Sequence, residues 1–100
     1  MNNPLYILVS KNLNLAYQGV QSLHAACQWL LDNKDQQTWN NQTVVVLEVD
    51  NVERWKEKLD MLGIDNSPFI EPDIGNVMTA VACQHDRHSI FRKLKLMGAS

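Results

Sequence analysis

Residues 4–10 have the sequence Pro-Leu-Tyr-Ile-Leu-Val-Ser, an uninterrupted apolar run that contains β-branched and aromatic side chains. An apolar run without polar alternation is typical of a strand that is buried on both faces of a sheet. We therefore expect residues 4–10 to form a central strand, with the other elements packed around it.

Turn and cap signals divide the rest of the chain. Asn14 can cap one helix. Asp50 and Glu53 have capping-box spacing ahead of a second helix, which we expect to end at Gly63. Runs rich in β-branched residues predict further strands. The sequence predicts strands at residues 4–10, 43–49, 67–71 and 77–83 and helices at residues 14–33, 51–62 and 86–93.

The expected order, β-α-β-α-β-β-α, belongs to the α/β class. Strand–helix–strand units favour parallel strands joined by right-handed crossovers, and a short connection between the last two strands favours an antiparallel pair. The length of 100 residues suits one domain. We expect a single three-layer domain over residues 1–100, in which a four-stranded mixed sheet has helices on both faces.

The helix at residues 14–33 has two faces of interest. Its apolar residues recur three and four apart, which predicts one stripe directed at the core. The stripe consists of Ala16, Val20, Leu23, Cys27, Leu30 and Leu31, and one edge of it carries Tyr17, Gln21, His24 and Gln28. We expect this polar edge to contribute to a functional site. Cys27 and Cys83 lie in apolar surroundings and are expected to be small buried side chains.

Composition excludes several classes of protein. The chain is 45% hydrophobic and 20% charged, which is ordinary for a globular domain. The longest apolar runs are far shorter than the roughly 20 residues of a membrane span. Two cysteines without zinc spacing, and no phosphate-binding or dinucleotide motif, predict no metal and no cofactor. Without a visible signal sequence, we expect a soluble cytoplasmic protein that does not bind membranes.

Charge is unevenly distributed along the chain. The net charge is −2, and acids predominate over residues 48–73. A basic stretch near the C-terminus contains Arg87, Arg92, Lys93 and Lys95. This stretch could contact a phosphate backbone or an anionic ligand. It could also simply be the solvated face of a helix.

A second candidate site is the turn at residues 71–76, Glu-Pro-Asp-Ile-Gly-Asn. Three side chains with acceptor oxygens meet there between two expected strands, at a sheet edge where scaffolds often place binding groups. The same residue types are also chosen for turn formation alone. Both interpretations are open.

Several segments resemble the type 2 peptidyl-tRNA hydrolases. The opening strand, the loop at residues 11–15 and the helix segment Val-Gln-Ser-Leu-His-Ala at residues 20–25 are similar to the family's first strand, loop and A-Q-x-x-H-A helix. Pro-Asp-Ile-Gly at residues 72–75 and Thr-Ala-Val-Ala at residues 79–82 resemble its D-A-G turn and final strand. Leu-Lys-Leu at residues 94–96 resembles its closing L-K-L. The resemblance covers essentially the whole chain, and compact members with an E-P-D-I-G-N loop are the most similar.

The resemblance implies hydrolysis of the ester between a peptide and the 3′ end of tRNA. It assigns catalysis to His24, Gln21 and Asp73, with Asp73 orienting water and His24 positioning the ester. Tyr17 stands where the family's helix often has Lys, and the loops after the first strand and after the D-A-G turn are shorter here. We expect the substrate to be bound by Tyr17, Glu71, Gly75, Asn76, Thr79, Arg87, Arg92 and Lys93.

Two other functions are compatible with the sequence. The same groove could hold a nucleotide or nucleotide-derived small molecule without catalysis, because Tyr17 suits base stacking better than proton transfer. The chain could also act as a homodimeric interaction domain in which the groove has no ligand.

Overall fold

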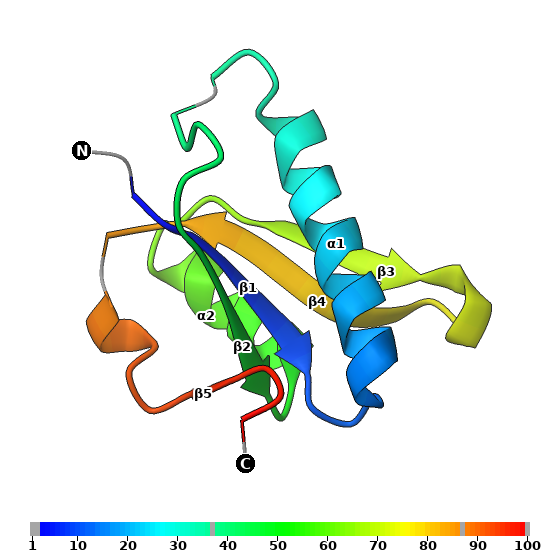
Figure 1. Cartoon of the computed structure of the whole chain (residues 1–100). Coiled ribbons are helices and arrows are strands. Elements are labelled where there is room, and N and C mark those ends of the chain that lie inside the picture. Colours follow the sequence, from blue (N-terminus) through cyan, green and yellow to red (C-terminus); the bar gives the residue numbers. More distant parts are fainter. Residues whose placement is uncertain (1–2, 37, 87, 100) are drawn as a thin grey trace.

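A five-stranded mixed sheet with one helix on each face forms the core of the computed structural model, which describes residues 3–36, 38–86 and 88–99 (Figure 1). The strands are β1 (Leu5–Ser10), β2 (Val44–Val49), β3 (Ser67–Glu71), β4 (Val77–Gln84) and β5 (Lys95–Leu96). The helices are α1 (Leu15–Asp32), α2 (Val52–Met61) and the short 3-10 turns η1 (Pro72–Ile74) and η2 (His88–Ile90). The α/β class, the mixed sheet and helices on both faces agree with the sequence-based expectation.

Strand β1 lies in the middle of the sheet, in the order β3-β4-β1-β2-β5. It pairs in parallel with β2 and antiparallel with β4, and β4 is also antiparallel to β3. Each residue from Leu5 to Val9 is at most 3% exposed. The prediction of a central strand buried on both faces is confirmed.

The two faces of β1 belong to two hydrophobic cores. Tyr6 and Leu8 point into the core beneath α2, where Leu59 and Phe91 are also buried. Leu5, Ile7 and Val9 point into the core beneath α1. This alternation follows from the two-residue period of a strand, and it requires an apolar residue at every position.

The sheet has five strands rather than the predicted four, and the predicted helix at residues 86–93 is wrong. The described residues there contain only the turn η2, and β5 then pairs antiparallel with β2. Phe91 explains the difference. Its ring packs 4.5 Å from that of Tyr6 and 5.8 Å from that of Trp55, measured between centroids. Burial of this one side chain overrides the local helical preference.

The helix caps agree in part with expectation. Asn14 caps α1, accepting a hydrogen bond from the Tyr17 N–H at 2.8 Å. The cap of α2 is Asn51, which accepts from the Arg54 N–H at 3.0 Å, rather than the predicted Asp50. Gly63 follows α2 with φ of +71°, a left-handed conformation that favours glycine.

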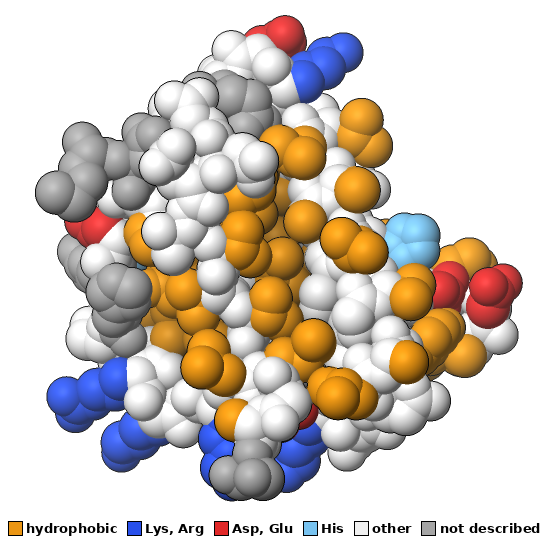
Figure 2. Space-filling view, viewed as in Figure 1, with side chains coloured by type: hydrophobic (Ala, Val, Ile, Leu, Met, Phe, Trp, Pro, Cys, Tyr) orange, Lys and Arg blue, Asp and Glu red, His pale blue; other side chains and the backbone are white. Residues whose placement is uncertain are grey.

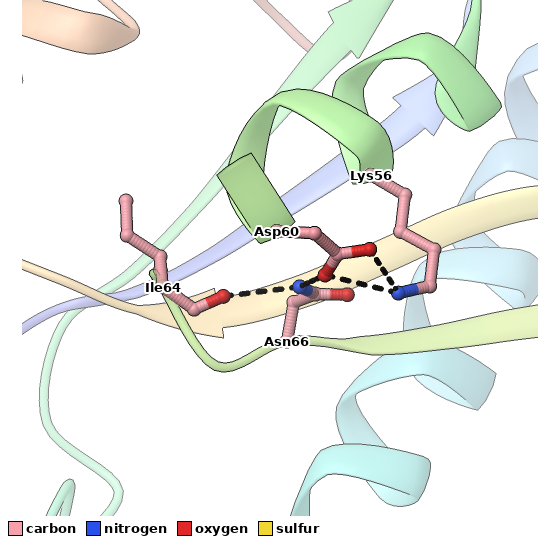
Figure 3. Close-up of polar contacts among 4 residues, drawn as sticks. All are labelled: Lys56, Asp60, Ile64 and Asn66. Carbon is pink, nitrogen blue, oxygen red and sulfur yellow. Dashed lines mark hydrogen bonds and ion pairs between the residues drawn. The ribbon is translucent and has the colours of Figure 1, made fainter. Parts of the chain in front are cut away.

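Polar contacts join the end of α2 to the start of β3 (Figure 3). The Asn66 amide donates to Asp60 at 2.7 Å and to the carbonyl of Ile64 at 3.0 Å. Lys56 also binds Asp60, at 2.9 Å. The hydrogen bond from Asn66 and then the one from Lys56 lower the pKa of Asp60. These contacts hold the connection that leads into β3.

Helix α1 lies with its polar side on the sheet, opposite to the predicted orientation. Its buried residues are Gln18, Gln21, Ser22, Ala25 and Trp29. The predicted core stripe points outward instead: Leu23 and Leu31 are each 67% exposed. At 100° per residue, the buried residues and the predicted core stripe are centred about half a turn apart around the helix axis.

Specific contacts explain this orientation. The Gln18 side chain donates to the Ser10 carbonyl at 3.0 Å, at the end of β1. Trp29 is buried and meets Trp39 edge to face, at 6.3 Å between centroids. As a consequence Cys27 is exposed, contrary to expectation, whereas Cys83 is buried as expected.

None of the helices in the described part of the chain is long and apolar enough to cross a membrane.

The orientation of α1 predicts that two large residues on this helix, two positions apart, contribute very differently to the stability of the fold. Trp29→Ala should lower the free energy of unfolding by about 3–5 kcal/mol, because it empties a core position. Leu31→Ala, on the exposed side, should change it by less than about 0.5 kcal/mol. Urea denaturation of both variants in dilute solution measures the difference. A comparable loss in Leu31→Ala would show that the apolar stripe, not the polar side, packs on the sheet.

Candidate functional site

A buried carboxylate, Glu71, lies at the centre of the candidate site. It is the last residue of β3 and is 7% exposed. The Gln21 amide of α1 donates to its Oε1 at 2.9 Å, and the Tyr17 hydroxyl donates to the same oxygen at 3.2 Å. The backbone N–H of Asp73 approaches Oε2 at 3.5 Å. Helix α1 and the turn after β3 are therefore joined through one side chain.

Gln21 uses both ends of its side chain in this network. Its Oε1 accepts a hydrogen bond from the Thr79 hydroxyl of β4, and its Nε2 donates to Glu71. Gln21 and Thr79 are each 0% exposed. Since its side chain is completely buried and bonded at both ends, Gln21 orients Glu71 and is out of reach of a substrate.

The network determines the protonation of its two acidic groups. The hydrogen bond from Gln21 lowers the pKa of Glu71 most, followed by the Asp73 N–H, Tyr17 and the charge of His24, although desolvation opposes them. Desolvation raises the pKa of Tyr17, and the charge of Glu71 and the hydrogen bond to it raise it further. At neutral pH Glu71 is an anion, and Tyr17 is a neutral donor that cannot act as a base.

His24 stands beside this network with its ring available to solvent. The imidazole is exposed and stacks on the Phe69 ring of β3, with 4.3 Å between centroids and 6° between planes. Figure 2 shows histidine and acidic side chains together at the right edge of the molecule, over α1 and the turn after β3. The stack fixes the plane of the imidazole, and His24 is close enough to Glu71 for its charge to lower the pKa of that carboxyl.

The turn after β3 is stabilised by local features, namely a cap and two residues with positive φ. Glu71 caps η1, and Gly75 ends it with φ of +86°. Asn76 follows with φ of +60°, and the side chains of Asp73 and Asn76 are exposed. Asp73 enters the network through its backbone N–H. The carboxylate at the centre of the network is Glu71, which the sequence analysis had placed among the substrate-binding residues, whereas the side chain of Asp73, the expected catalytic acid, is exposed.

The expected basic residues do not join this site. Arg87 lies outside the described residues. Arg92 and Lys93 precede β5, at the opposite edge of the sheet from β3. Four strand spacings of about 4.8 Å place β5 and β3 about 19 Å apart. The structure therefore separates the predicted site into two regions.

The second region is a cleft of 470 Å³ at the ends of the parallel strands β1 and β2. The chain leaves β1 toward α1 on one face and leaves β2 toward α2 on the other. In open α/β sheets, ligands bind at such a switch point, beyond the carboxyl ends of the strands. The charged residues that line it are Lys11, Glu48, Asp50, Arg54, Lys93 and Lys95. Lys11 and Asp50 form an ion pair at 2.6 Å.

The sequence analysis missed this cleft, although the β-α-β-α order contains the signal for it. Lys11 and Asp50 each follow a predicted strand, and parallel strands end at the same side of a sheet. Within the part of the chain that the structure describes, no group of three His, Cys, Asp or Glu residues is arranged to hold a metal ion.

Comparisons with known proteins support the fold and give no information on function. No family model matches the sequence, and no curated protein matches it. Among solved structures, a protein of unknown function from Agrobacterium tumefaciens is similar, with a TM-score of 0.69 and 15% identity. The match covers 96% of this chain and 98% of that chain. At this identity the similarity shows a shared fold and carries no function.

The lowered pKa of Glu71 predicts a pH dependence of stability. The folded-state pKa lies below the unfolded value, so the unfolded chain binds more protons between the two. Stability from this group is complete above the unfolded pKa and is lost as the pH falls through the folded pKa. Urea unfolding between about pH 5 and pH 3 should therefore show a smaller loss in Glu71→Gln than in the wild type. Glu57→Gln, an exposed carboxylate of α2, controls for the change in net charge. Equal losses in all three proteins would contradict the proposed role of the network.

Proposed function

We propose that the protein hydrolyses the ester between a peptide and the 3′ end of tRNA, at a site formed by His24 and Glu71. The hydrogen bond of 2.9 Å between Gln21 and Glu71 carries the proposal. It joins the helix segment and the turn, two of the parts of the sequence that resemble type 2 peptidyl-tRNA hydrolases. His24 from the same helix lies beside them with its ring exposed.

In this mechanism, His24 acts as the base. Its neutral imidazole takes a proton from a water molecule as the water attacks the ester carbonyl carbon. The negative charge of Glu71 stabilises the imidazolium that forms. The bond between the carbonyl carbon and the ribose oxygen then breaks, and the imidazolium returns its proton to that oxygen. Such positioned proton transfer contributes about 10²–10⁴-fold to a rate.

The turn after β3 supplies the other groups. The exposed Asp73 carboxylate would orient the water, and the Asn76 amide would donate to the oxyanion that develops on the ester. Gln21 holds Glu71 in place and is a positioning residue. Tyr17, at the position of the family's lysine, donates to Glu71 and keeps its own proton.

The cleft at the ends of β1 and β2 would bind phosphates of the tRNA. Its four cations, Lys11, Arg54, Lys93 and Lys95, outnumber the two carboxylates of Glu48 and Asp50. Lys93 and Lys95 of the cleft lie at β5, at the opposite edge of the sheet from β3, on which His24 stacks. A ligand that reached from these lysines to His24 would have to span about four strand spacings. The acceptor stem of a tRNA is long enough to do so.

One observation favours a second candidate, the non-catalytic binding of a nucleotide. The exposed, flat stack of His24 on Phe69 offers an aromatic face, and a nucleic-acid base can stack on such a face without base-specific hydrogen bonds. In that case the protein would bind a nucleotide and release it unchanged.

Hydrolysis of a peptidyl-tRNA with a blocked amino end tests the proposal. His24→Ala and Asp73→Asn should each lower the rate at least about tenfold. Cys27→Ser, on the exposed side of the same helix, should leave it unchanged. The released peptide is quantified while intact tRNA is checked in parallel. Absence of turnover by the wild-type protein would exclude the hydrolase function, and nucleotide binding without turnover would establish the second candidate.

Salt dependence of tRNA binding tests the role of the cleft. Each lost phosphate contact should flatten the slope of log K against log salt by somewhat under one unit. Lys93→Ala with Lys95→Ala should therefore reduce the slope by about one to two units. Lys34→Ala, beyond the far end of α1, is the matched control and should retain the wild-type slope. Binding that is insensitive to salt between about 50 and 200 mM would contradict polynucleotide recognition.

A further inference from the structure

The outer face of α1 is apolar along its whole length. Ala16, Val20, Leu23, Cys27 and Leu30 follow one another at steps of three and four, and all five are exposed. We propose that this outer stripe binds the same stripe of a second copy of the chain, forming an antiparallel pair of α1 helices. Spacing of this kind is that of a seam between two helices.

The charge of α1 favours an identical partner. Between Leu15 and Leu31 the helix contains no Asp, Glu, Lys or Arg. Two copies therefore meet without repulsion between like charges. A charged partner would lose hydration at this face without gaining an ion pair, so charge complementarity argues against it.

The outer stripe continues into an apolar groove beside α1. Because α1 packs mainly on β3, β4 and β1, it leaves the side of β2 partly uncovered. The groove there has a volume of 290 Å³, and its lining includes Leu23, Ala26, Val46 and Met97. Figure 2 shows hydrophobic side chains gathered over α1 and in the hollow next to it. Leu23 belongs to both surfaces.

The exposed apolar area is of the same order as the apolar area that a small homodimer buries. Five side chains are between 44% and 67% exposed: Val20 and Leu23 of the outer stripe, Val44 of the groove, and Leu15 and Leu31 on the same helix as the outer stripe. Full burial of a leucine corresponds to roughly 100 Å² of apolar surface, so these five side chains together offer roughly 300 Å². A standard interface of about 800 Å² per partner, about 65% apolar in homodimers, buries roughly 500 Å² of apolar surface. The two values are of the same order.

Side-chain sizes favour the antiparallel arrangement. With the two-fold axis at Leu23, Ala16 of one copy faces Leu30 of the other, and Val20 faces Cys27. Small residues then oppose larger ones, which allows close packing. In a parallel pair, Leu30 would face Leu30 at one end of the seam, and Ala16 would face Ala16 at the other.

Sedimentation equilibrium over about 1 µM to 1 mM protein tests this proposal. The wild type should convert from monomer to dimer within this range. Leu23→Lys should raise the dissociation constant at least tenfold. Met61→Lys replaces an apolar side chain that is 87% exposed on α2 and should leave the constant unchanged. Val20→Gln is a second variant of the outer stripe, in case Leu23→Lys does not fold.

Thiol labelling supplies an independent measurement. Cys27 should react with a thiol reagent rapidly in dilute wild-type protein and more slowly as the concentration rises, because the partner covers it. In Leu23→Lys the rate should not depend on concentration. A wild type that is monomeric throughout, or variants of the outer stripe that dimerise as the wild type does, would overturn the proposal. An equal loss of dimer in Met61→Lys would also overturn it.

Discussion

The buried Gln21 side chain, bonded at one end to Thr79 and at the other to Glu71, is the contact on which the remaining features depend. It holds the polar side of α1 against the sheet. This orientation places Tyr17 on the Glu71 carboxylate and His24 on Phe69. It also turns the apolar residues of the helix outward. The candidate active site and the proposed dimer surface are therefore two results of one rotation of α1.

A fully bonded polar network is required for that rotation. Rotating α1 by half a turn would bury Leu23 and Leu31 but would leave Glu71 and Thr79 without Gln21. Buried polar groups that lose their partners cost about 1–3 kcal/mol each, and charged groups cost more. A satisfied network thus specifies one packing of the helix over its alternative. This packing leaves the apolar residues of α1 exposed to solvent, and the proposed second copy of the chain would cover them.

Local signals in the sequence predicted most elements, and global packing decided the rest. The apolar run of β1 and the Asn14 cap can be recognised in the sequence, because each depends only on nearby residues. Periodicity also grouped Tyr17, Gln21 and His24 on one edge of a helix near the turn after β3. It could not tell which side of α1 faces the sheet, since an apolar stripe suits a core or a partner equally. Phe91 similarly replaced an expected helix through a contact with Tyr6, which is distant in sequence.

A double-mutant cycle on Gln21→Leu and Thr79→Val measures the central contact directly. If Gln21 joins α1 to β4, urea unfolding of the two single variants and the double variant should give a coupling free energy of about 0.5–3 kcal/mol. Leucine at position 21 should also destabilise the fold, although it is the more apolar residue. Additive effects, with Gln21→Leu neutral or stabilising, would contradict the account, because they would mean that the network does not determine how α1 packs.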